Sequence, residues 1–77
     1  MKPHEVLTRE QILQLLVMTT EQAAMFLGMS RQKLESLRVK GDGPRYAKLG
    51  RLVRYRREAL LGWVSANERA HTSEPAQ

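Results

Sequence analysis

The chain has 77 residues and a formal net charge of +5, a length that allows one small domain. A domain of this size has little room for the walls of an enclosed pocket, which weighs against an enzyme. The absence of cysteine excludes disulfides and cysteine-ligated zinc. His4 and His71 lie near opposite ends without carboxylates at metal-ligand spacing, so we expect no metal and no cofactor.

No stretch approaches the run of about 20 apolar residues that spans a membrane, and the first residues do not resemble a signal peptide. We therefore expect a cytoplasmic protein. The charge is unevenly distributed: ten of the 13 lysines and arginines lie between Arg31 and Arg57, with only two acidic residues among them. A basic segment of this kind is typical of a polyanion-binding protein.

Residues 1–7 are expected to be a flexible lead-in to a domain at 8–70. Thr8 and Gln11 have the spacing of a capping box, and the apolar residues after them predict a short helix from about Arg9 to Val17. Such a helix is marginal alone, so it must pack on something. We favour packing over the last helix, with packing on a neighbouring copy as the alternative.

A second capping box, Thr19 with Gln22, begins a helix that should end at Gly28, because glycine readily adopts the left-handed C-cap conformation. Ser30 then provides a strong N-cap for a third helix from about Arg31 to Lys40. Two helices joined by so few residues must cross at a steep angle. The pattern predicts a helix-turn-helix.

The sequence Gly-Asp-Gly-Pro at 41–44 breaks the third helix. Alternating residues then predict strands at about Arg45–Leu49 and Leu52–Tyr55, joined by a tight turn at Gly50-Arg51. The expected fold is mostly α with a small β-hairpin, a winged helix-turn-helix with an additional N-terminal helix.

A last helix is expected from about Glu58 to Arg69, with Trp63 anchoring it to the core. Residues 71–77 have no apolar periodicity and are expected to be disordered.

The third helix has the pattern of a DNA-reading helix. Leu34 and Leu37 share its inner face, and a polar face edged by cations lies opposite, where glutamine suits adenine and arginine suits guanine. The helix N-terminus and the cations suit phosphates. The alternative is an ordinary solvated helix, which its position between a tight turn and a basic hairpin disfavours. The predicted DNA-binding residues are Ser30, Arg31, Gln32, Lys33, Glu35, Ser36, Arg38 and Lys40.

The hairpin carries cations at its tip and on both strands, so it can lie along a DNA backbone as a wing. The alternative is a ribbon whose cations are merely solvated. Tyr46 and Tyr55 do not interleave with the charges as stacking platforms would, which favours duplex DNA over single strands. The predicted wing contacts are Lys48, Arg51, Arg54 and Arg56. Ser30, Ser36 and Ser65 have no histidine near them in sequence, and no glycine-rich phosphate loop is present, so we expect no catalysis.

The segments TTEQAAMFLGMSRQKLESL and YAKLGRLVRYRREAL, the Gly-Pro loop between them and the following Trp63 resemble the excisionase and AlpA-like branch of the MerR-type winged helix-turn-helix proteins. The resemblance runs from about Met18 to Val64. It implies that the helix after Ser30 reads the major groove and that the tip at Gly50-Arg51 enters the minor groove. Family members are small accessory proteins of phages and mobile elements. Some bend DNA near attachment sites and direct an integrase toward excision, and others regulate transcription.

Two positions depart from the family pattern, which commonly has an acidic residue at Leu61 and alanine at Gly62. An exposed Leu61 would add to an apolar packing surface, and Gly62 would permit close backbone packing. The leading expectation is an excisionase-type recombination directionality factor in a bacterial or phage-infected cell, associated with the nucleoid. Its expected partners are double-stranded DNA, an integrase and neighbouring copies of itself. A transcriptional regulator and a basic protein-interaction module are the alternatives.

Overall fold

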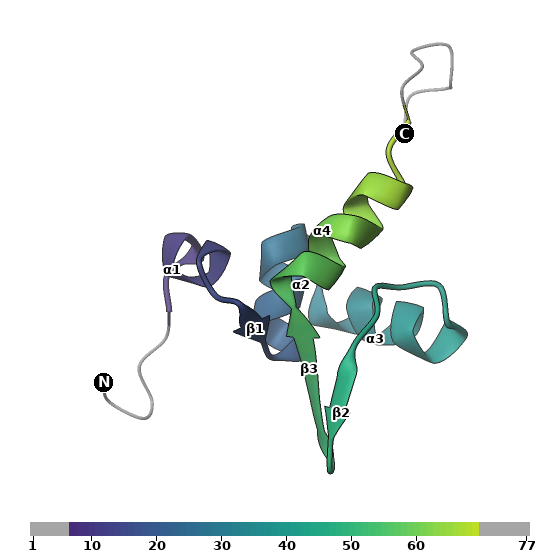
Figure 1. Ribbon diagram of the computed structural model, residues 1–77, viewed down its shortest axis with the longest axis horizontal. Coiled ribbons are helices and arrows are strands. Elements are labelled where there is room, and N and C mark those ends of the chain that lie inside the picture. Colours follow the sequence, from purple (N-terminus) through teal and green to yellow (C-terminus); the bar gives the residue numbers. More distant parts are fainter. Residues whose placement is uncertain (1–6, 70–77) are drawn as a thin grey trace.

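The computed structural model describes residues 7–69, so the tails expected at the two ends lie outside the described residues, apart from Leu7. Figure 1 shows helices gathered around the base of a small sheet, with a hairpin projecting from it. The predicted fold class is confirmed, because the chain is mostly helical with a three-stranded antiparallel sheet. The elements in order are α1 (Arg9–Leu13), β1 (Val17–Met18), α2 (Thr20–Leu27), α3 (Arg31–Lys40), β2 (Ala47–Leu49), β3 (Leu52–Arg56) and α4 (Arg57–Ala66).

The N-terminal segment differs from its prediction. The capping box of Thr8 and Gln11 is present, but α1 ends at Leu13 rather than at Val17, and Val17–Met18 forms β1 instead. The reason is tertiary: β1 pairs antiparallel with the base of β3, and the Arg57 backbone N–H donates to the Leu16 carbonyl. These bonds satisfy backbone groups that the end of an exposed helix would leave to water.

The position of α1 also corrects the sequence interpretation. This helix packs within the domain, but mainly on α2 rather than over α4. Ile12 is its one buried residue and joins the central core. Leu61 is left 50% exposed on α4.

The helix-turn-helix forms as its capping residues predict. Thr19 caps α2 in a second complete capping box, and Gly28 ends the helix with φ of 74°, the left-handed conformation. Ser30 then caps α3, its hydroxyl accepting a hydrogen bond from the Lys33 backbone N–H. The two helices therefore follow each other across a short turn, and they pack together.

The wing is the β2–β3 hairpin. Ala47 lies opposite Arg54, Lys48 opposite Val53 and Leu49 opposite Leu52. The turn at Gly50-Arg51 is confirmed, with Gly50 at φ of 67°. Strand β2 begins at Ala47, later than predicted, and β3 extends one residue further, to Arg56. Because the strand order is β1-β3-β2, β3 is the central strand. It pairs with β1 only at its base.

Helix α4 begins at Arg57 and ends at Ala66, so both of its boundaries differ from the predicted Glu58–Arg69. Leu60 is its buried residue. Trp63 is half-buried and does not belong to the core cluster, so the prediction that it anchors the core is wrong; its indole N–H instead donates to the Asp42 carbonyl, 3.0 Å away. The close packing expected at Gly62 is also absent, since a Cβ there would meet nothing within 4 Å.

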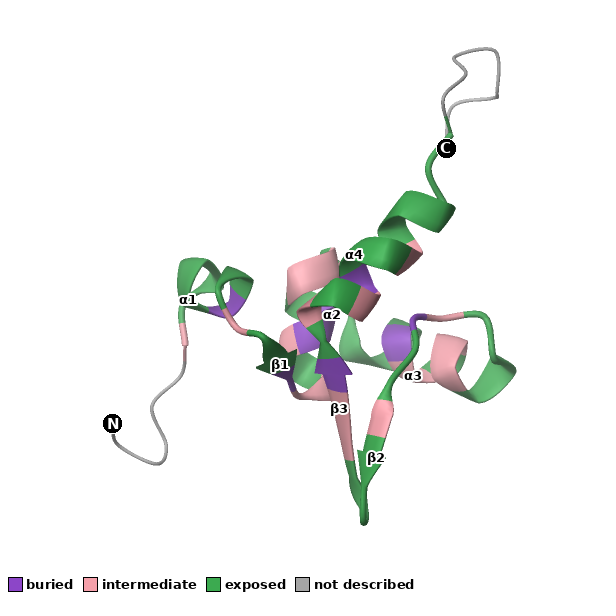
Figure 2. Ribbon diagram, in the orientation of Figure 1, coloured by how far each residue is buried: buried purple, intermediate pink, exposed green. Residues whose placement is uncertain are grey.

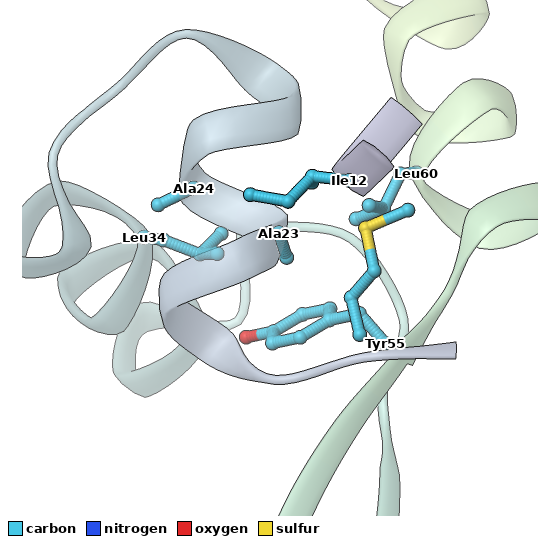
Figure 3. Close-up of a cluster of buried hydrophobic side chains, with 7 residues drawn as sticks. Ile12, Ala23, Ala24, Leu34, Tyr55 and Leu60 are labelled. Atoms are coloured by element: carbon cyan, nitrogen blue, oxygen red, sulfur yellow. The ribbon is translucent and has the colours of Figure 1, made fainter. Parts of the chain in front are cut away.

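The core lies where α2, α3, α4 and the base of β3 meet (Figure 2). Figure 3 shows side chains from all of these elements, and Ile12 from α1, converging around Ala23 and Tyr55. The buried cluster consists of Ile12, Met18, Ala23, Ala24, Leu34, Tyr55 and Leu60. Within residues 7–69, no helix is long and apolar enough to cross a membrane.

Candidate nucleic-acid interface

Helix α3 presents a polar face to solvent because Leu34 holds the opposite face in the core. Leu34 is fully buried and Leu37 is half-buried, as the spacing predicts. On the other side Gln32 and Ser36 are exposed, Glu35 is partly exposed and Val39 is 85% exposed. Of the predicted contacts on this helix, those with exposed side chains are Ser30, Arg31, Gln32, Lys33, Ser36 and Lys40.

Two predicted contacts near the start of α3 bind each other. The Arg31 guanidinium Nε lies 3.1 Å from Glu35 Oε2, one helical turn away. Both side chains are more than one third exposed, and an ion pair so exposed contributes little to stability. The pair can therefore open at small cost when either residue meets a stronger partner.

Arg38 has a different environment from the other cations of α3. It is half-buried, and its Nη1 donates to Thr20 Oγ1 at 3.2 Å and to the Tyr55 hydroxyl at 3.1 Å. Its guanidinium carbon also lies 5.8 Å from the centre of the Tyr46 ring. Arg38 thus connects α3 to α2 and to β3. Sequence reasoning missed this network because its members are far apart in the chain and carry no local motif.

The predicted wing residues do not lie together. Lys48 and Arg51 are exposed near the tip, and Arg54 is half-buried with its Nη1 donating to the Val53 carbonyl. Arg56 lies at the base of the wing, opposite Val17 of β1, and forms an exposed ion pair with Glu58. The tip and the middle of the wing are therefore separate from the cation at its base.

An open hollow of about 370 Å³ lies between the helix-turn-helix and the wing. It brings together residues from the start of α2, one side of α3 and the outer half of β3. Four of its lining residues are arginines and two are acidic, so the hollow has a positive balance. Glu21 and the two threonines were not predicted as site residues. The lining residues are Thr19, Thr20, Glu21, Arg31, Glu35, Arg38, Arg51, Leu52, Val53 and Arg54.

A second hollow lies between the other side of the wing and α4. It is lined by Arg45, Tyr46, Ala47, Arg56, Glu58 and Ala59. Arg56 and Glu58 form an ion pair in this hollow, so Glu58 partly neutralises the positive charge that Arg45 and Arg56 bring to it. Among residues 7–69, no group of three or more His, Cys, Asp or Glu side chains could hold a metal ion.

A helix-turn-helix with an exposed polar second helix, followed by a cationic β-hairpin, is the arrangement of a winged helix-turn-helix protein. The chain belongs to the helix-turn-helix domain family, whose profile matches residues 17–68. This family comprises DNA-binding domains, which are not typically catalytic, and includes excisionase- and AlpA-like small proteins. Comparison with curated proteins found no match. The chain is therefore a DNA-binding helix-turn-helix protein, with duplex DNA as the partner that this domain indicates.

Proposed function

We propose that this protein binds specific sequences of duplex DNA and serves as an excisionase-type recombination directionality factor. Helix α3 lies in the major groove, and the wing contacts the adjacent backbone and minor groove. The protein organises the DNA for an integrase and catalyses no reaction itself. Its sites are in the cytoplasm, on the bacterial nucleoid or on phage DNA.

The arginine-lined hollow between α3 and the wing is the observation that carries the DNA-binding part of this proposal. Arg31, Arg51 and Arg54 come from two separate elements and line one concave surface. A convex sugar-phosphate backbone fits such a surface, and its phosphates accept hydrogen bonds from guanidinium groups. The backbone held there orients the duplex so that the exposed face of α3 meets the base edges.

Sequence reading is assigned to the exposed polar residues of α3. Gln32 can pair with adenine through two hydrogen bonds, and Ser36 can donate to or accept from several bases. Val39 offers an apolar contact for a thymine methyl group. Lys33 and Lys40 suit phosphates on either side of the groove, which position the helix without reading sequence.

The recombination role is supported by the resemblance to excisionases over residues 18–64. In this role neighbouring copies bind side by side near an attachment site, and an integrase is the protein partner. A transcriptional regulator would use the same surface at a promoter, so the positions of the binding sites distinguish the two roles.

The test is to capture random genomic fragments of the source with purified protein at moderate salt and to sequence them. Clusters of closely spaced sites beside a recombination attachment region are expected. Isolated sites over promoters would instead identify a regulator, and no enrichment would refute sequence-specific DNA binding in favour of a protein partner. The variant Gln32→Ala provides the matched control, because it should enrich these sites less selectively while remaining folded.

A further inference from the structure

The tip of the wing carries two leucines that no core requirement explains. Leu49 and Leu52 lie directly opposite each other, immediately behind the Gly50-Arg51 turn. They are 58% and 53% exposed. Neither joins the buried cluster, although Val53, next to Leu52, packs against it. Exposure of more than half of each residue forfeits much of the stabilisation that full burial would supply.

The pairing places the two leucines on one face of the ribbon. Directly opposite residues of antiparallel strands point to the same side, and neighbouring residues in a strand point to opposite sides. Leu49 and Leu52 therefore share the face opposite Val53 and Tyr55, which face the core. Together they form an apolar surface near the tip of the hairpin. This tip points away from the helices (Figure 1).

The charges around this surface indicate what covers it. Lys48 precedes Leu49 and Arg51 precedes Leu52, and both cations are exposed. A partner for the tip must therefore combine a negatively charged exterior with an apolar interior. Duplex DNA has this combination, because phosphates line the two edges of the minor groove, and the apolar faces of the stacked bases become accessible from the groove where a base step opens.

We propose that Leu49 and Leu52 form an apolar wedge that enters a base step from the minor groove, partly unstacks it and kinks the duplex. This inference rests on the proposed binding of duplex DNA. Arg51 and Lys48 contact the phosphates on the two sides of the groove and hold the wedge in place. A minor-groove wedge bends DNA toward the major groove. The major groove is where α3 lies in this arrangement, so the bent duplex closes around the protein and gains phosphate contacts.

The test uses a short duplex enriched from a random-sequence library by the wild-type protein, with fluorophores at both ends and 2-aminopurine at successive positions. The wild-type protein is expected to bend this duplex by about 20–90° and to raise 2-aminopurine fluorescence at one step under the wing. The variant L49S/L52S should abolish the fluorescence rise and most of the bend. Its salt dependence of binding should be unchanged, because every cation is retained.

Two further variants control for the loss of surface leucines. L49M/L52M keeps a flexible apolar tip and should retain the bend. L16S/L61S removes two exposed leucines outside the wing and should bend DNA like the wild-type protein. Thermal unfolding of each variant establishes that it folds.

Several results would overturn the wedge. One is bending and unstacking by L49S/L52S equal to that of the wild-type protein, and another is tight binding by the wild-type protein with no bend at all. A self-associated protein that dissociates in L49S/L52S would assign the leucines to a second copy. Equal affinity for the enriched duplex and a scrambled one refutes the proposed sequence specificity, but leaves the wedge testable on either duplex.

Discussion

Arg38 connects three elements through one guanidinium group, and this use competes with binding to DNA. Its hydrogen bond to Tyr55 gives a partner to the hydroxyl of a fully buried side chain. A buried hydroxyl without a partner costs about 1–3 kcal/mol. The geometry thus favours Arg38 as a positioning residue that fixes how α3 sits against α2 and the wing.

We expect Arg38→Met to lower the free energy of unfolding by about 1–3 kcal/mol, because Thr20 and Tyr55 both lose their donor. Urea unfolding followed by circular dichroism measures the change. Lys40→Met, at an exposed position of the same helix, serves as the control and should change stability little. Unchanged stability of Arg38→Met with a large loss of DNA affinity would place Arg38 in the interface instead.

Two glycines are expected to respond to alanine in opposite directions. A Cβ on Gly43 would lie 2.9 Å from the Cβ of Leu37, so Gly43→Ala should destabilise the domain by about 1–3 kcal/mol. A Cβ on Gly62 meets nothing within 4 Å, so Gly62→Ala should stabilise α4 by about 1 kcal/mol. Urea unfolding of both variants decides the matter, and a destabilising Gly62→Ala would contradict the open space seen there.

At the scale of elements, the same capping motif occurs on two helices of different importance. Thr19 begins α2, which carries the buried Ala23 and Ala24. Thr8 begins α1, which has five residues and contributes only Ile12 to the core. The effect of losing a cap should therefore depend on how much of the domain the helix supports.

Thr19→Ala is expected to lower global stability by about 1 kcal/mol, because the Gln22 backbone N–H loses its acceptor. Thr8→Ala removes an equivalent bond but should mainly increase local opening of α1. Hydrogen exchange read residue by residue separates the two effects. Equal loss of protection throughout the domain in both variants would show that α1 unfolds only with the rest.

Local signals explain which elements could be predicted from the sequence. The caps at Thr19, Gly28 and Ser30 and the turn at Gly50 each depend on residues within one or two turns, and all four form as expected. Strand β1 could not be predicted, because Val17 extends a helical apolar pattern locally and becomes a strand only by pairing with Arg56. The start of α4 at Arg57 likewise involves a distant residue, since the Arg57 backbone N–H donates to the Leu16 carbonyl.

In the candidate site too, the features set by local sequence could be predicted and those set by distant contacts could not. The exposed face of α3 was predictable from the spacing of Leu34 and Leu37. The hollow was not, because it depends on the angle between the wing and the helices, which no short stretch of sequence encodes. Arg38 illustrates the difference: its position on the helix was predictable, but its partners Thr20 and Tyr55 were not.

At the scale of the whole molecule, DNA affinity should have two separable contributions, one from the charges that contact phosphates and one from the residues that read bases. Arg51→Ala removes a cation from the hollow, so it should weaken binding to all sequences and reduce the slope of log affinity against log salt by about one. Gln32→Ala should leave that slope unchanged and relax the preference for one sequence over others. Affinity titrations at several salt concentrations, on an enriched and a scrambled duplex, measure both. An unchanged slope for Arg51→Ala would remove the wing from the interface.

The pairing of β1 with β3 also has a consequence for the order in which the domain assembles. Val17 and Arg56 are far apart in the chain, separated by α2, α3 and β2, whereas α2 and α3 are neighbours. Contacts between distant residues form slowly because the intervening chain must close a loop first. The contacts between α2 and α3 can therefore form early in folding. The base of the wing is completed only when β3 has paired with β1, so we expect the two helices to be in place before the hairpin is fixed against them.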